Sequence, residues 1–231
     1  MRINKFISET GYCSRRAADK LIDAGRVTIN GNVAELGSQV EKTDAVEIDG
    51  QPLQAKPELE YLILNKPVGI TCTTERDIEG NIIDFVNHPK RIFPIGRLDK
   101  DSDGLIILTN DGDIVNRILR AENNHDKEYI VTVDAPITET FIEGMASGVD
   151  ILGTTTKECV VEQLESRTFR IVLTQGLNRQ IRRMCKEFGY RVKRLQRVRI
   201  MNVELGDLPI GEWRDLTESE MKTLFQILDQ Q

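Results

Sequence analysis

The sequence is poor in the residues that build disulfide frameworks and metal sites. It has four cysteines and two histidines in 231 residues. The cysteines, Cys13, Cys72, Cys159 and Cys185, are scattered and lack the paired spacings of a zinc site or a disulfide framework. We therefore expect reduced, mostly buried thiols and no bound metal.

Long apolar runs are also missing. No stretch approaches the length that spans a bilayer, and no charged segment followed by an apolar run opens the chain, so neither a membrane span nor a secretion signal is expected. A glycine-rich phosphate loop and a dinucleotide fingerprint are absent too. The sequence thus predicts a cytoplasmic protein that needs no cofactor.

The charge is acidic overall but unevenly distributed. A net charge of -6 argues at first against nucleic acid as a partner. However, nine basic residues stand within residues 179–199 against the single acid Glu187. A second basic group near the N-terminus consists of Arg2, Lys5, Arg15, Arg16, Lys20 and Arg26. Two basic surfaces on an acidic protein indicate localised contact with phosphates.

Residues 1–48 have the pattern of a small separate domain. Apolar spacing predicts two short helices, the second capped by Ser14 and ended by Gly25, followed by strands around a turn at Asn30-Gly31. The segments RINKFI (2–7), CSRR (13–16) and GRVTING (25–31) resemble the alpha-L RNA-binding domain. The resemblance implies binding to structured RNA by shape and backbone contacts.

The rest of the chain predicts a linker and a larger domain. Residues 49–60 contain Gly50, Pro52 and Pro57 and few apolar side chains, which is typical of a linker. Residues 61–231 alternate short strands with helices and indicate an α+β domain around a mostly antiparallel sheet. Strands are expected at 61–64, 105–108, 127–133, 158–163, 168–174, 192–197 and 200–204, and helices at 82–86, 113–120, 139–145, 179–188 and from a Thr217 cap to about 228.

One stretch of this domain, residues 93–109, combines an acidic turn with a buried strand. Pro94 and Gly96 break any helix before the turn, and the apolar run at 105–108 predicts the strand after it. A carboxylate held on such a loop can be aimed. With Arg97 two residues before it and an arginine cluster downstream, Asp99 is expected to act as an acceptor or nucleophile.

Two alternatives compete for this acidic turn. Its residues could be ordinary turn formers, because Asp side chains bond local backbone and glycine accepts positive φ. A calcium loop is the other alternative, since Asp99, Asp101, Asp103 and Gly104 occupy its first, third, fifth and sixth places. The calcium pattern fails at the twelfth place, where Asn110 stands instead of glutamate, and at the missing incoming helix.

Three motifs of the second domain resemble the signatures of the RsuA-type pseudouridine synthases. They are GRLDKDSDGL (96–105), KEY (127–129) and GLNRQIRRM (176–184). The resemblance covers essentially the whole chain, and residues 87–91 and 114–133 look closest to the RluF group, which acts on large-subunit ribosomal RNA. A long basic C-terminal tail of some members is missing, which bears on RNA affinity more than on chemistry.

The resemblance implies an isomerase that needs neither redox chemistry nor an energy source. In these terms Asp99 is the essential nucleophile or base, attacking the sugar or assisting formation of a glycal. Arg182 is expected to pair with Asp99, Tyr129 to stack on the uracil and Leu173 to form an apolar wall. Arg97, Arg179 and Arg183 are expected to bind substrate. The target uridine must leave its stack, and basic side chains hold the flanking phosphates.

Purely structural roles for the site residues stay open at this point. Tyr129 could be core packing, Arg182 a solvated charge on a helix, and Leu173 is expected in the core in either case. The expected partner is RNA, ribosomal RNA first and a transfer RNA second, with no membrane, and the protein is expected to be a monomer. The alternative is a non-catalytic RNA-binding or ribosome-assembly factor that uses the same basic surfaces.

Overall fold

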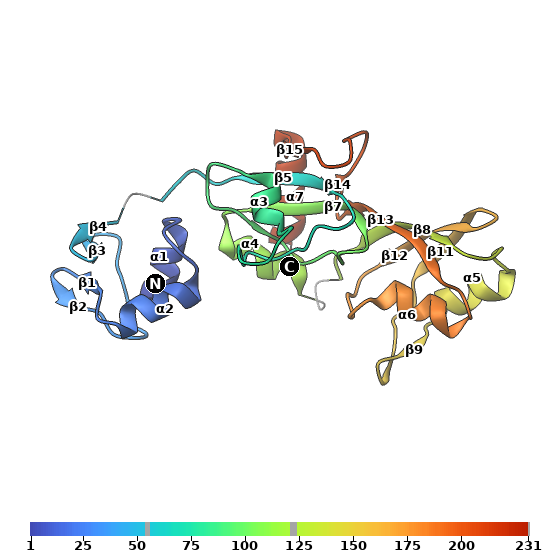
Figure 1. Cartoon of the computed structure of the whole chain (residues 1–231), viewed down its shortest axis with the longest axis horizontal. Coiled ribbons are helices and arrows are strands. Elements are labelled where there is room, and N and C mark those ends of the chain that lie inside the picture. The colour runs from blue at the N-terminus through green and yellow to red at the C-terminus, as the bar shows by residue number, and fades with distance from the viewer. Residues whose placement is uncertain (54–55, 121–123, 231) are drawn as a thin grey trace. The chain divides into compact units, whose positions relative to one another are not determined.

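The chain folds into two compact units (Figure 1). The computed structural model describes residues 1–53, 56–120 and 124–230. The smaller unit comprises Met1–Glu60, His88–Ile92 and Asn110–Gly112, and the larger comprises Tyr61–Asn87, Phe93–Thr109 and Asp113–Gln231. Within the described residues, each helix is too short or too polar to cross a membrane.

The smaller unit packs two helices against a small sheet. Helices α1 (Ile3–Glu9) and α2 (Arg15–Asp23) bury apolar residues such as Ile7 and Ile22. As predicted, the Ser14 hydroxyl caps α2, accepting a hydrogen bond of 3.1 Å from the Ala17 amide. The sheet has the order β2 (Asn32–Val33), β1 (Val27–Ile29), β3 (Val46–Ile48) and β4 (Gln51–Pro52).

Strand β4 lies inside the segment predicted as a linker. It pairs with β3, and Leu53 donates a backbone hydrogen bond of 3.0 Å to Val46 and packs against the core of the smaller unit. The prolines and glycine that suggested a linker therefore belong in part to an edge strand and its turn. Residues 54 and 55 of the predicted linker lie outside the described residues.

The larger unit is built around one mixed sheet, which confirms the predicted α+β class. Its pairs are antiparallel except for the parallel pair of β13 and β7. The sheet order is β11 (Val160–Glu165), β12 (Thr168–Leu173), β8 (Lys127–Val133), β13 (Val192–Ile200), β7 (Asp103–Thr109), β5 (Tyr61–Lys66) and β15 (Trp213–Asp215), with β14 (Val203–Glu204) on β13 and β6 (Phe93–Pro94) on β7; β9 (Asp150–Ile151) and β10 (Thr154–Thr155) form a separate hairpin.

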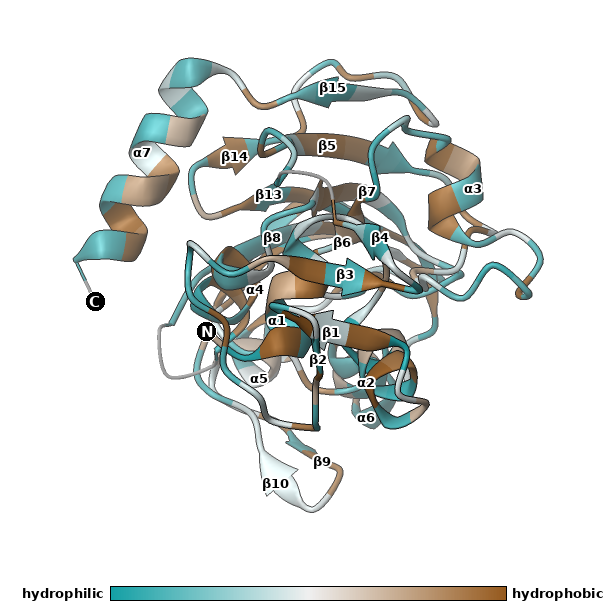
Figure 2. Ribbon diagram, turned by 90° about the vertical axis from the view of Figure 1, so that its left-hand side faces the viewer, coloured by the Kyte–Doolittle hydropathy of each residue, from teal (hydrophilic) through white to brown (hydrophobic). Residues whose placement is uncertain are grey.

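Helices cover the sheet in two groups. The helices of this unit are α3 (Ile82–Val86), α4 (Gly112–Leu119), α5 (Glu139–Ala146), α6 (Gln180–Glu187) and α7 (Glu218–Asp229). Helices α4 and α7 share one core with β5 and β7, which are hydrophobic over most of their length (Figure 2). On α5, Phe141 meets the rings of Phe169 and Phe188 edge-on at 5.3 and 5.7 Å. Helices α4 and α7 therefore pack on the half of the sheet that contains β5 and β7, and α5 packs on the half that contains β12.

Most predicted elements are confirmed, with shifted ends. Strand β8 has its predicted bounds, and the Thr217 hydroxyl and Glu220 carboxylate form a capping box at the start of α7. Two expected strands, 192–197 and 200–204, are instead the long strand β13 and the short β14. The hairpin of β9 and β10 and the edge strand β15 were not predicted, because two or three residues carry too little pattern.

Candidate active site

The acidic turn is fixed at both ends by β7. Before the turn, the Ile95 amide donates a 2.8 Å hydrogen bond to the Ile107 carbonyl, and Gly96 has φ +76°. At its far end the Ser102 amide bonds the Asp99 carbonyl at 3.0 Å, which closes the turn. Because all of β7 is buried, the turn is anchored to a strand inside the core of the unit.

Sheet register brings Tyr129 close to this turn. Arg197 on β13 pairs with Tyr129 of β8 on one side and with Gly104 of β7 on the other. Side chains that share a register line across neighbouring strands lie side by side. The tyrosine and the aspartate turn are therefore neighbours in space although thirty residues separate them in the sequence.

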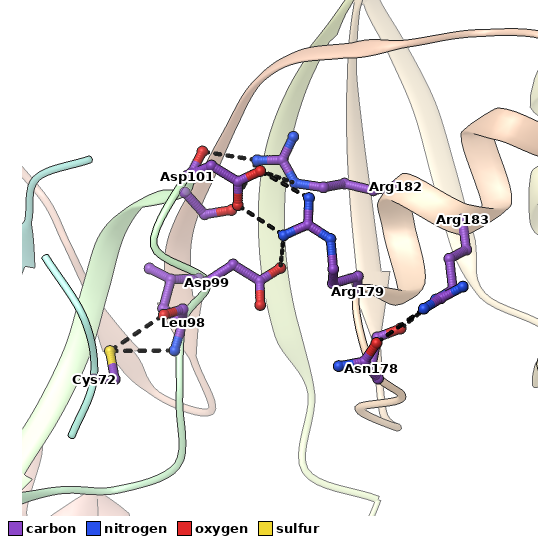
Figure 3. Close-up of polar contacts among 9 residues, drawn as sticks. Cys72, Leu98, Asp99, Asp101, Asn178, Arg179, Arg182 and Arg183 are labelled. Carbon is purple, nitrogen blue, oxygen red and sulfur yellow. Dashed lines mark hydrogen bonds and ion pairs between the residues drawn. The ribbon is translucent and has the colours of Figure 1, made fainter. Parts of the chain in front are cut away.

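The segment before α6 supplies the opposing positive charge. Arg179 has φ +51°, a left-handed conformation that is uncommon for a residue with a side chain. Its guanidinium lies 3.6 Å from the Asp99 carboxylate, and it donates hydrogen bonds of 3.0 and 2.8 Å to the two oxygens of Asp101 (Figure 3). This fork-to-carboxylate geometry is among the strongest for an exposed pair.

Arg182 contacts Asp101 and Ser102 of the turn and not the Asp99 carboxylate. Its Nη2 donates 2.8 Å to the Asp101 carbonyl and 3.0 Å to the Ser102 hydroxyl, and its Nε lies 3.5 Å from the Asp101 carboxylate (Figure 3). The predicted pair of Arg182 with Asp99 is therefore wrong in its partner. The physical reason is the left-handed backbone of Arg179 itself, just before α6, which directs its guanidinium to Asp99 while Arg182, inside the helix, contacts the turn backbone.

The two aspartates of the turn differ in their electrostatic surroundings. The hydrogen bonds from Arg179, reinforced by the charges of Arg182 and Arg179 and opposed by partial burial, lower the pKa of Asp101 below its ordinary value. The same contact raises the pKa of Arg179. Among the described residues Asp99 has one ion pair, with Arg179, and 38% of its side chain is exposed. Asp101 therefore fixes the arginines while Asp99 stays accessible.

A cavity of about 120 Å³ opens beside Asp99. The predicted residues Asp99, Tyr129, Leu173, Arg97, Arg179 and Arg182 all line it. Leu173 is 3% exposed, as expected of an apolar wall. Ser102, Leu195 and Arg197, which were not predicted, also line the cavity. Carboxylate, phenol, guanidinium groups and apolar wall thus meet in one hollow.

Two of the additional lining residues are held by the sheet. Arg197 is 4% exposed and its Nε donates 2.7 Å to the Leu105 carbonyl, while its Nη2 is buried without a hydrogen-bond partner in the described part of the chain. The inward alternation of Leu195 and Arg197 along β13 is the sequence signal that could have found both. Ser102 could have been recognised only from its contact with Arg182.

Arg183 is the one predicted substrate-binding residue of the larger unit that lies away from the cavity. It donates 2.9 Å to the Asn178 carbonyl and 3.1 Å to the Asn178 side chain (Figure 3). The basic run at 179–199 is also not one open surface. Arg194 pairs with Asp103 at 2.8 Å, and Arg199 pairs with Asp126 at 2.8 Å. These cations stabilise the fold as well as providing charge.

The N-terminal basic residues lie on the smaller unit. Arg15 and Arg16 begin α2, Lys20 lies further along it, and all three are exposed. Arg2, just before α1, is exposed too. Lys5 lies 3.4 Å from Glu9, and Arg26 forms a bidentate pair with Asp49. Of the predicted RNA-binding residues, those on α2 are the most available to phosphates.

The turn does not have the geometry of a calcium loop. Its carboxylates face guanidinium groups instead of converging: Asp99 faces Arg179, Asp101 faces two arginines, and Asp103 faces Arg194. Strand β7 starts at Asp103, where that motif requires the loop to continue. Among the described residues, no group of histidine, cysteine and carboxylate side chains could hold a metal ion.

Comparison with known proteins identifies a family for each of the two parts of the chain. A family model described as RNA pseudouridylate synthase matches residues 60–187, and one described as the S4 domain matches residues 1–46. The dual-specificity RNA pseudouridine synthase RluF of Escherichia coli is 59% identical over 99% of this chain and 80% of its own length. The ribosomal large subunit pseudouridine synthase B of Bacillus subtilis is 32% identical over 99% of this chain and 97% of its own.

A solved structure extends the likeness to three dimensions. A crystal structure of a pseudouridylate synthase, 32% identical in sequence, superimposes with a TM-score of 0.72 over 97% of this chain and 99% of its own. The family model covers more than half of the chain, and the sequence likeness covers nearly all of it. The chain belongs to the RNA pseudouridine synthases, isomerases that act on RNA, and carries an S4 RNA-binding domain at its N-terminus.

Proposed function

We propose that this enzyme converts a uridine of large-subunit ribosomal RNA into pseudouridine, with Asp99 as the catalytic carboxylate. The observation that carries the proposal is the cavity where Asp99, Tyr129 and Leu173 meet beside Arg179. A relative 32% identical is named for the large ribosomal subunit, and one 59% identical is named as dual-specific. We therefore include a transfer RNA as a second substrate.

The proposed reaction balances without a co-reactant. The bond from ribose C1′ to base N1 breaks, the uracil turns, and C1′ joins C5, while C5 loses a proton and N1 gains one. Asp99 starts the reaction in one of two ways. It attacks C1′ of the ribose, or it removes a proton from the ribose so that a glycal forms. Tyr129 stacks on the freed uracil and Leu173 gives it an apolar wall. Both features hold a detached base in place while it turns.

The arginines act by position in this proposal. Arg179 sets a positive charge 3.6 Å from the Asp99 carboxylate. Arg182 fixes the backbone of the turn through the Asp101 carbonyl and the Ser102 hydroxyl. Arg97 and Arg183 bind the RNA backbone, together with the cations of α2. We propose that the protein acts as a monomer in the cytoplasm, where ribosomal RNA is found.

Release of tritium from RNA labelled at uracil C5 tests the role of Asp99. We expect Asp99→Asn to lower release by at least about a thousandfold, because the variant keeps the shape but loses the nucleophile or base. RNA affinity should stay close to that of the wild type. Asp207→Asn is the matched control, since Asp207 is exposed and forms no side-chain bond with a described residue.

Two outcomes would contradict the proposal. Turnover retained in Asp99→Asn would remove Asp99 from its role. Tight RNA binding by the wild type with no tritium release from any ribosomal or transfer RNA would favour the non-catalytic assembly factor. Chemical mapping of pseudouridines in RNA from cells with and without the protein then identifies the target nucleotide.

A further inference from the structure

A second hollow lies on the other side of the Asp99 turn. It measures about 770 Å³, against about 120 Å³ for the cavity that holds Asp99 and Tyr129. Arg97, Leu98, Asp99 and Arg179 line both spaces. The turn is therefore a partition with a small hollow on one side and a wide groove on the other.

The groove has a polar rim and an apolar wall. Arg97 and Lys100 are exposed, and neither forms a side-chain bond or ion pair with a described residue. Ile78 and Leu119, which are 39% and 40% exposed, lie in the same groove with Phe93. Large apolar side chains next to unpaired cations match a nucleotide, which has a π face and a phosphate.

The partition itself is tightly built. Gly96 has φ +76°, and a methyl group on it would lie 2.9 Å from the Leu119 side chain, so α4 packs directly against the turn. The Cys72 thiol also bonds both backbone groups of Leu98 (Figure 3). An RNA strand whose target base occupies the small cavity would therefore continue past Asp99 into the groove.

We propose that this groove binds the nucleotides next to the target uridine on the same RNA strand. The inference rests on the proposed function, because it assigns the small cavity to the target base. Lys100 and Arg97 take the flanking phosphates, and the wall of Ile78, Phe93 and Leu119 takes a neighbouring base. In this way the groove reads the surroundings of the target and contributes to the choice of site.

The charge of the groove is tested through the salt dependence of RNA binding. The probe is in vitro transcribed large-subunit ribosomal RNA, and the variants are Lys100→Gln and Lys222→Gln. Loss of one phosphate contact should reduce the slope of log affinity against log salt by roughly 0.7 to 0.9 in Lys100→Gln. Lys222 is exposed on α7, outside the groove, so its variant should keep the wild-type slope.

The apolar wall gives an independent test. Replacing Ile78 with serine removes apolar surface without changing charge, so Ile78→Ser should bind the same RNA roughly fivefold more weakly with an unchanged salt slope. In turnover assays the loss in both groove variants should fall on KM more than on kcat. Thermal melting checks that each variant is folded.

Failure of this inference and failure of the proposed function look different. If Lys100→Gln and Ile78→Ser both bind RNA as Lys222→Gln does, the groove is not a nucleotide site, whatever the turnover. If the wild type binds RNA but releases no tritium, the proposed function fails while the affinity comparison still decides the groove. Weaker binding by both groove variants, with the two predicted salt responses, supports it.

Discussion

The acidic turn and the strand that follows it are adjacent in the chain but opposite in construction. Residues 97–102 hold charged groups, several of them exposed, whereas every residue of β7 is buried. The turn offers a carboxylate to a substrate, and the strand fixes where that carboxylate lies. The difference suggests that changes in β7 act on folding, and changes in the turn act on chemistry with little effect on folding.

The largest effect on stability is expected at Gly104. It has φ +110°, and a methyl group there would overlap the Arg197 carbonyl oxygen and lie 2.7 Å from the Arg197 amide nitrogen. Gly104→Ala therefore strains the backbone and pushes β7 from β13, which should cost about 3 to 5 kcal/mol in the free energy of unfolding. Urea denaturation measures this loss.

Gly189 provides the matched comparison. It also has a positive φ, +78°, but a methyl group would meet nothing within 4 Å. Gly189→Ala should cost only about 1 kcal/mol, the usual price of a left-handed residue with a side chain. Equal losses in the two variants would mean that the close approach of β7 and β13 does not limit stability.

A smaller effect, on turnover, is expected at Asp101. Asp101→Asn removes the charge that holds Arg179 and Arg182, and should lower kcat by roughly ten- to a hundredfold, since a charged hydrogen bond contributes about 1.5 to 3 kcal/mol. Stability should change little because Asp101 is half exposed. Tritium release at saturating RNA, together with urea denaturation, separates the two effects.

The double variant tests whether Asp101 acts through Arg179. If it does, Asp101→Asn combined with Arg179→Gln should be no slower than the worse single variant. Additive losses would instead show two separate contributions, and unaltered kcat in Asp101→Asn would remove its positioning role. Asp207→Asn again serves as the control for removal of an exposed carboxylate.

The sequence predicted the parts of the site but not all of its pairings. The caps Ser14 and Thr217 and the strand β8 follow from local patterns that tertiary contacts only reinforce. The partner of Asp99 does not. Successive residues of a helix point about 100° apart, so the different contacts of Arg179 and Arg182 depend on the left-handed backbone of Arg179, just before α6.

Burial of charge was equally hidden in the sequence. Arg197 belongs to a basic run that suggested an open surface, yet the alternation of β13 turns it inward. Lys66, at the end of β5 and two residues beyond the predicted strand 61–64, is fully buried, and its ammonium donates to the Pro67 and Ile70 carbonyls at 2.8 and 3.0 Å. Burial lowers the pKa of Lys66. Such contacts form only once distant segments have packed, so composition cannot predict them.

The smallest effect is expected behind the turn, at Cys72. Its buried thiol accepts from the Leu98 amide at 3.4 Å and donates to the Leu98 carbonyl at 3.3 Å, immediately before Asp99. Burial raises the pKa of this thiol, which keeps the proton that it donates. Cys72→Ala should lower kcat about three- to tenfold by loosening the turn, whereas Cys72→Ser keeps both bonds and should restore most of the rate.

Cys159 separates this positioning effect from simple loss of a thiol. Its sulfur also donates to a carbonyl, that of Met145, at 3.3 Å, but it does not line the cavity or the groove. Cys159→Ala should therefore leave kcat unchanged even if it lowers stability as much as Cys72→Ala does. If Cys72→Ala, Cys72→Ser and Cys159→Ala all have the same kcat, β7 and the arginines alone hold the turn. Cys72 then has no positioning role.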